Sequence, residues 1–191
     1  MKRKSITITA IFLLMASLFT TQMHAQLSAG IKAGMNVAGF KSDDDDQESK
    51  TGIVLGAFTA YSLTPKFDLQ AELMFSQQGA KEGSGSYNFN YIVLPVIAKF
   101  SVWNNLYVSS GPQFGFLGSA KTKEDGEKED IRDNVKSSDL SWIFGAGYQF
   151  KQGFVADMRF IPGLSDISDN SARIKNTVFQ LTIGYRIGKR K

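Results

Sequence analysis

The feature that most constrains this chain is a two-residue alternation of side-chain character, repeated over eight stretches of ten or more residues. It is clearest over 66–78, where apolar residues such as Phe67 and Leu69 are separated by polar residues such as Asp68 and Gln70. Successive side chains of a β-strand point to opposite faces, so this period predicts strands. The predicted strands cover residues 28–40, 51–63, 66–78, 87–101, 105–118, 139–150, 153–163 and 176–188.

The connections between these strands alternate in length. Short turns fall at 64–65, 103–105 and 151–153, whereas longer polar or charged segments cover 41–50, 79–86, 119–138 and 164–175. An even strand number with short turns at one end and long loops at the other is typical of outer-membrane barrels, whose tilted strands cross the bilayer in ~9–11 residues. The pattern therefore predicts an all-β fold, an eight-stranded antiparallel up-and-down transmembrane β-barrel.

Glycine placement indicates which face of the predicted sheet meets lipid. Eight glycines lie on the small and polar faces of the strands: Gly30, Gly34, Gly56, Gly111, Gly115, Gly145, Gly147 and Gly184. A soluble β-sandwich or lipocalin-like barrel points its apolar face inward, and a soluble core built from these glycines would be hollow. Eight strands around a narrow axis instead favour small residues inside. We therefore expect the large apolar side chains to face outward.

Two features of the predicted strands depart from a regular barrel. Pro95 and Pro112 lie within strands, where each removes a hydrogen-bond donor from the ladder, so we expect bulges or local irregularity there. The second and fourth strands are apolar on both faces, at Val54 and Val93 among other positions. Part of the lumen is therefore expected to be a dry plug.

The first 25 residues have the layout of a secretory signal peptide. Residues 2–4 are basic, an apolar run covers 6–19, and Ala25 precedes the expected cleavage site before Gln26. Removing the leader lowers the formal net charge from +4 to +1, because it holds three of the 22 Lys and Arg and none of the 18 Asp and Glu. The predicted mature domain, 26–191, is therefore not expected to bind nucleic acid.

Most enzyme chemistries lack their residues in this chain. The sequence contains no Cys, and the single His, His24, lies in the predicted leader. The mature chain then has no thiolate and no imidazole for a catalytic triad, a zinc site or a general base. The acidic runs 43–46 and 124–130 do not match a spaced Ca²⁺ loop, and such runs are usually solvated. We expect no enzyme activity, no metal site and no cofactor.

Charged residues on the inward faces are the main candidates for a functional site. They are Lys32, Asp68, Glu72, Lys99, Asp157, Arg159 and Arg186. They could form a charged passage or a structural network of ion pairs. The network is favoured, because eight strands enclose room only for side chains or one small ligand, and charges away from water must be paired. Asp68 and Glu72, with Cα atoms ~13 Å apart along one strand, are too distant for a catalytic pair.

Aromatic residues near the predicted strand ends suggest two interfacial girdles. Phe67, Trp103 and Phe150 fall at the turn end, and Tyr87 and Trp142, together with Phe89, fall at the loop end.

Several segments resemble a known family. They are GIKAGMNVAGF (30–40), LQAELMFSQQGAK (69–81), NYIVLPVIAKF (90–100), GAGYQF (145–150), MRFIPGLSDIS (158–168) and NTVFQLTIGYRIG (176–188). Together they resemble the PorT-like outer-membrane β-barrel family, within the porin family of outer membrane protein beta-barrel domains. The resemblance implies an eight-stranded barrel that tolerates proline in its fourth and fifth strands.

The pattern and the resemblance together lead to one functional expectation. We expect an integral protein of the outer membrane of a Gram-negative bacterium, with a largely filled lumen and a structural or interaction role through its extracellular loops. Its expected partners are outer-membrane lipid and, as a further option, envelope or secretion-system proteins. The alternative is an accessory component of a protein-secretion or transport system, because the family's founding member resembles one.

Overall fold

The computed structural model describes residues 26–41, 48–82, 85–124, 127–132, 136–165 and 175–188. The predicted signal peptide and the acidic run 43–46 lie outside the described residues. Nearly all of the described chain is β-strand. Among the described residues, no helix has the length and apolar character needed to span a bilayer.

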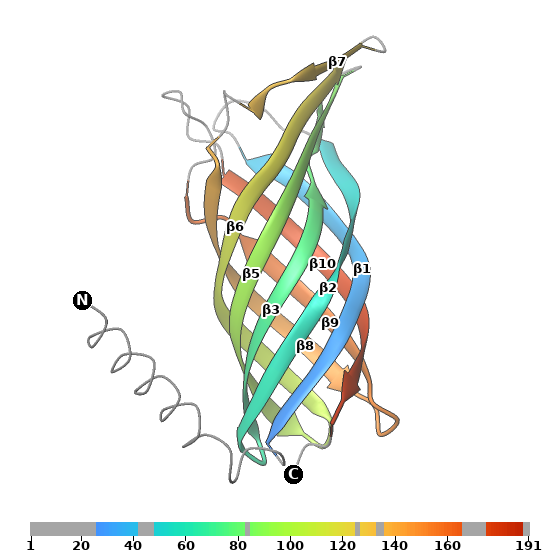
Figure 1. Ribbon diagram of the computed structural model, residues 1–191, viewed down its shortest axis with the longest axis vertical. Helices are drawn as coiled ribbons and strands as arrows, with labels where there is room; N and C mark the ends of the chain where they lie inside the picture. Colours follow the sequence, from blue (N-terminus) through green and yellow to red (C-terminus); the bar gives the residue numbers. More distant parts are fainter. Residues whose placement is uncertain are drawn as a thin grey trace, which may run out of the picture.

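The strands form a closed antiparallel barrel (Figure 1). They are β1 (Leu27–Lys41), β2 (Glu48–Thr64), β3 (Phe67–Gln78), β4 (Ala80–Glu82), β5 (Gly85–Trp103), β6 (Leu106–Glu124), β7 (Glu127–Asp130), β8 (Ser138–Gln149), β9 (Phe154–Pro162) and β10 (Lys175–Ile187). Each of the eight long strands pairs with its neighbour in the chain, and β1 pairs with both β2 and β10. The predicted eight-stranded up-and-down barrel is therefore confirmed.

The short turns gather at one end of the barrel. They join β2 to β3, β5 to β6 and β8 to β9, with two to four residues between the strands. Asn104 and Gly153 in two of these turns have positive φ angles of 47° and 96°. Asn and Gly adopt this left-handed conformation more readily than other residues, so both are suited to tight reversals.

Two short strands lie where the sequence predicted loops. β4 and β7 extend the sheet at the opposite end, and Figure 1 shows the β5, β6 and β7 arm rising above the rest of the barrel. β6 continues to Glu124, and β7 then pairs back on it. The Asp-Gly dipeptide at 125–126 is a strong signal for a two-residue hairpin loop. The strand predicted over 105–118 therefore continues to Glu124, and the predicted connection 119–138 contains the paired strand β7.

The two strand prolines disturb the ladders without shifting them. Pairing between β3 and β5 is interrupted at Pro95, and pairing between β5 and β6 is interrupted at Pro112, with the register unchanged on either side. The register shifts lie elsewhere, after Ser62, Asn90 and Ser101. The expected irregularity is confirmed, and the expected bulges at the prolines are not. A proline removes one donor, but its fixed φ is compatible with an extended strand.

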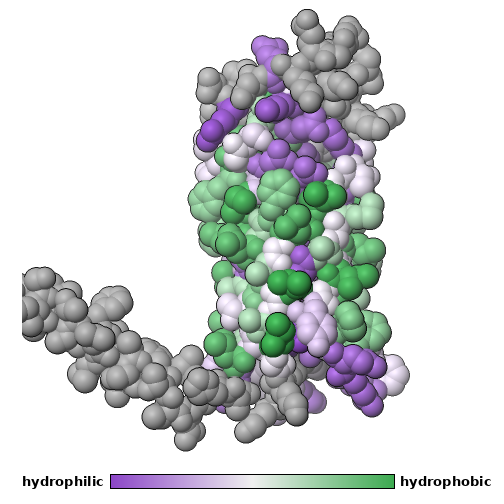
Figure 2. Space-filling view, turned by 45° about the vertical axis from the view of Figure 1, so that its right-hand side comes forward, coloured by the Kyte–Doolittle hydropathy of each residue, from purple (hydrophilic) through white to green (hydrophobic). Residues whose placement is uncertain are grey.

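Side-chain direction alternates along each strand between lipid and lumen. Ile31 and Ile183 on the outer wall are 67% and 66% exposed, whereas the adjacent Lys32 and Thr182 are 3% and 1% exposed. Figure 2 shows hydrophobic residues over the middle of one face of the barrel, with hydrophilic residues toward its ends. A soluble protein would not present this continuous apolar wall, so the outward polarity predicted from glycine placement is confirmed.

Candidate functional site

Glycines on the inner wall make room for large side chains in the bore. A Cβ at Gly30 would collide with the Phe58 ring, and a Cβ at Gly147 would collide with the Tyr107 ring and hydroxyl. Each ring lies against a cation. Lys32 Nζ is 5.2 Å from the centre of the Phe58 ring, and Lys99 Nζ is 4.3 Å from the centre of the Tyr107 ring. Glycine therefore permits the packing around the interior charges.

Glu72 on β3 accepts hydrogen bonds from three other side chains, on β9, β1 and β3 itself. Arg159 on β9 binds it through two nitrogens, with Nη1 2.8 Å from Oε2 and Nη2 2.6 Å from Oε1. Lys32 on β1 donates to Oε1 at 3.1 Å, and the Gln70 side-chain amide donates to the same oxygen. Paired N–H groups of arginine match a carboxylate's two oxygens, and such charge-assisted bonds are stronger than neutral ones.

Asp157 on β9 is the second carboxylate of this cluster. Its Oδ2 accepts from Lys32 Nζ at 2.5 Å, and its Oδ1 accepts from the Tyr107 hydroxyl at 2.5 Å. Lys99 Nζ lies 3.6 Å from Oδ1 and donates to the Tyr107 oxygen at 3.2 Å. Lys32 therefore bridges Glu72 and Asp157, and the cluster joins strands that are not neighbours in the barrel wall.

A separate ion pair lies nearer the turns. Arg186 Nη1 on β10 donates to Asp68 Oδ2 on β3 at 2.9 Å and to Gln149 Oε1 at 3.1 Å. Its Nε donates to Ser28 Oγ at 2.8 Å. All seven charged residues predicted to face the lumen thus lie inside the barrel, each less than a tenth exposed, in one five-member cluster and one pair.

The space between the pair and the cluster is a cavity of about 10 Å³. Its polar lining residues are Asp68, Gln70, Lys99, Tyr107, Gln149 and Arg186, and Phe58 and Val155 supply apolar surface. Asp68, Tyr107 and Gln149 each lie within two residues of a short turn, so the cavity is at the turn end. A cavity of this size holds about one water molecule.

Two apolar clusters lie in the half of the bore nearer the long loops, beside buried polar side chains such as Asn36 and Gln78. One cluster consists of Val54, Met74, Phe89, Tyr91, Val93, Leu117 and Ala120, and the other of Ala38, Ile97, Ile143, Ile161 and Val178. Ile131, in the segment after β7, packs on the first cluster. The apolar lumen packing predicted from the second and fourth strands is therefore present at this end, through Val54 and Val93.

The carboxylates of the interior cluster are ion-paired with cations. Glu72 and Asp157 are each held by two or more cationic groups, which leaves neither positioned as a free acid or base. In the described part of the chain, no group of three or more His, Cys, Asp or Glu side chains is arranged to hold a metal ion. The arrangement can fix strand positions and fill space.

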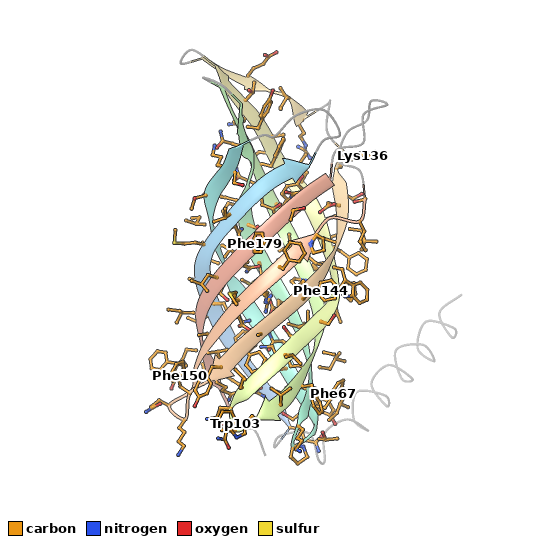
Figure 3. All side chains as sticks on the ribbon, turned by 180° about the vertical axis from the view of Figure 1, so that it is seen from behind. Phe67, Trp103, Lys136, Phe144, Phe150 and Phe179 are labelled. Atoms are coloured by element: carbon orange, nitrogen blue, oxygen red, sulfur yellow. The ribbon has the colours of Figure 1, made fainter. Side chains whose placement is uncertain are left out.

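The predicted interfacial aromatics separate into two groups. Trp103, Phe150 and Trp142 are exposed on the outer wall, and Phe67 is partly exposed there. Figure 3 shows Phe67, Trp103 and Phe150 together at the turn end, with Phe144 and Phe179 farther along the barrel. On the outer wall, the Trp142 indole donates to Ser110 Oγ at 2.9 Å.

The girdle assignment of Tyr87 and Phe89 was wrong. Phe89 is 4% exposed within the first apolar cluster, and Tyr87 packs against the same cluster. Tyr87 and Phe89 lie an even number of residues from the inward-facing Val93 on β5, so their side chains point to the same face. A position near the end of the strand does not change that face.

Three members of the network were not predicted. Tyr107, Gln70 and Phe58 all contact the charged cluster. Gln70 lies between Asp68 and Glu72 on the same face of β3, so the alternation alone was enough to include it. Tyr107 and Phe58 gave a weaker signal, because an aromatic residue on an inward face also suits an apolar plug.

Comparisons with known proteins agree with this architecture. A family profile described as "Outer membrane protein beta-barrel domain" matches residues 19–169. The attachment invasion locus protein Ail of Yersinia pestis is 23% identical, with a TM-score of 0.52 over 85% of this chain and 99% of Ail. Neisserial surface protein A (NspA) is 12% identical, with a TM-score of 0.59 over 82% of this chain and 96% of NspA. No curated protein matches the sequence. At these identities the two structures show a shared fold.

Proposed function

The chain belongs to the family described as outer membrane protein beta-barrel domain, and from that premise we propose a non-enzymatic outer-membrane protein with a closed lumen. Its location is the outer membrane of a Gram-negative bacterium. Its role is structural or interactive, and the working surface is the end of the barrel that carries the long loops and the β6–β7 hairpin. The bore does not serve as a passage for solutes.

One observation carries this proposal: packed side chains occupy both halves of the described interior. The ionic cluster occupies the half nearer the turns, and the two apolar clusters occupy the half nearer the loops. A porin-type channel needs a continuous wet lumen, which is found in barrels of many more strands. Here a solute would have to displace both paired charges and packed apolar side chains.

Conductance across a planar bilayer tests the closed lumen. The refolded protein is expected to give no discrete conductance steps, and steady openings in the wild type would refute the proposal. A double variant, Phe89→Gly with Ile97→Gly, removes side chains from both apolar clusters and serves as the positive control. It is expected to leak more than a matched double variant at the lipid face, Leu73→Ala with Ile183→Ala.

The finer alternative is a PorT-like accessory role in protein secretion. The β5–β6–β7 arm offers a surface beyond the barrel for a partner protein. Extraction in mild detergent followed by identification of co-purifying proteins distinguishes the two roles. Recovery with secretion-system components would favour the accessory role, whereas recovery of the barrel alone would favour a self-sufficient surface protein.

A further inference from the structure

The charges buried inside the barrel do not cancel. Among the described residues, the buried cations are Lys32, Lys99, Arg159 and Arg186, and the buried anions are Asp68, Glu72 and Asp157. Four positive and three negative groups leave an excess of one positive charge. An uncompensated charge in a protein interior is strongly unfavourable, so either a further anion balances it or one of the cations loses its proton.

Lys99 is the buried cation whose contact with a carboxylate is the longest of the four. Lys32 and Arg159 donate directly to carboxylates, and Arg186 is paired with Asp68. The Lys99 ammonium is 3.6 Å from Asp157 Oδ1, longer than a hydrogen bond, and it donates to the neutral Tyr107 hydroxyl. The Tyr107 hydroxyl in turn donates its own hydrogen bond to Asp157 Oδ1.

The cavity at the turn end lies against this loosely compensated cation. Lys99 and Arg186 both line it, together with the side-chain amides of Gln70 and Gln149. Its one carboxylate, Asp68, is already neutralised by Arg186. The volume of about 10 Å³ matches one water molecule or one monatomic ion.

We propose that this cavity is a binding site for a single small monovalent anion, chloride in a salt solution, held between Lys99 and Arg186. The ion brings the buried charge to zero and ties β5 to β10 across the bore. The inference goes beyond the proposed function, because a closed lumen requires no bound ion and a bound ion requires no closed lumen. Conductance and anion binding are therefore tested separately.

Thermal unfolding of the full mature protein in detergent tests the site. Sodium chloride is exchanged for sodium gluconate at constant ionic strength, so that screening stays the same while the small anion is removed. The unfolding midpoint is expected to rise saturably with chloride, by about 2–4 °C. Crystals grown in sodium bromide are expected to give an anomalous peak beside Lys99 Nζ.

A matched pair of variants assigns the effect to the cavity. Lys99→Met is expected to abolish the chloride dependence, whereas Lys66→Met, at an exposed turn position of the same end, is expected to retain it. If Lys99→Met does not fold, the proposal is tested on the wild-type protein alone, by the chloride dependence of its unfolding midpoint and by the bromide peak in its crystals. A midpoint that is the same in chloride and gluconate, or crystals without bromide in this cavity, would overturn the proposal and leave a neutral Lys99 amine as the account of the charge balance.

Discussion

Replacing Glu72 with Gln is the most direct test of the interior network. The substitution preserves size and one acceptor oxygen, but it removes the negative charge that faces Lys32 and Arg159. It also places an NH₂ group where Oε2 now accepts from Arg159 Nη1 at 2.8 Å, so two donors would face each other. Counted over the protein's own buried side chains, the excess of positive over negative groups would rise from one to two.

The expected cost follows from this geometry. Removing one partner of a buried ion pair costs about 3–5 kcal/mol, because the remaining charges stay buried without compensation. One lost charge-assisted hydrogen bond, about 1.5–3 kcal/mol, is already contained in that figure. We therefore expect Glu72→Gln to lower the free energy of unfolding by about 3–5 kcal/mol, a large fraction of the stability of a typical domain.

Urea titration of the protein in lipid micelles measures this loss of unfolding free energy. At each urea concentration, the folded fraction is read from the band whose gel mobility shifts on boiling. The control is Glu129→Gln on β7, an exposed site where a change within about 0.5 kcal/mol is expected. The double variant Glu72→Gln with Arg159→Met removes one charge of each sign and should recover part of the stability. A Glu72→Gln protein as stable as the wild type would refute the idea that the network holds the barrel together.

Four further substitutions test other parts of the structure. Leu181 is 61% exposed on the outer wall, and Leu181→Arg is expected to lower the free energy of unfolding by about 2–4 kcal/mol, the cost of an arginine near the bilayer midplane. Leu164→Arg, beyond β9, is expected to lower it by only about 0–1 kcal/mol in the same urea titration. Gly147→Val should destabilise by about 1–3 kcal/mol, because the new side chain would overlap Tyr107, and an unchanged urea midpoint would argue against close packing there. Ile131→Ser should free the segment after β7 from the apolar cluster, so limited trypsin digestion of folded protein should cut the hairpin faster while the barrel fragment stays intact.

Local periodicity predicted most of the wall of this barrel. A period of two assigns every residue of a strand to one of two faces once a single residue is placed, and glycines such as Gly56 and Gly184 placed the inner face. The same rule was sufficient to place Tyr87 and Phe89 inside. Their misassignment came from weighing nearness to a strand end above parity.

The partners of the interior charges were not predictable in the same way. Lys32 on β1 reaches Glu72 on β3 and Asp157 on β9, and neither strand is its neighbour in the wall. Contacts across the bore depend on how far each strand is staggered along the axis, and stagger is a property of the closed barrel. The sequence shows which charges face inward, whereas their pairing appears only after closure.

The ionic cluster also bears on why the strands keep their register. A slip of β3 by one residue would turn Asp68, Glu72 and Gln70 toward the acyl chains and bring Leu69 and Leu73 into the bore. Charged groups on the lipid face are costly, and the cations left inside would lose their carboxylates. An apolar lumen would penalise the same slip less, because leucine is tolerated on either face. The network therefore contributes specificity of register in addition to stability, and its removal is expected to increase misregistered species during refolding.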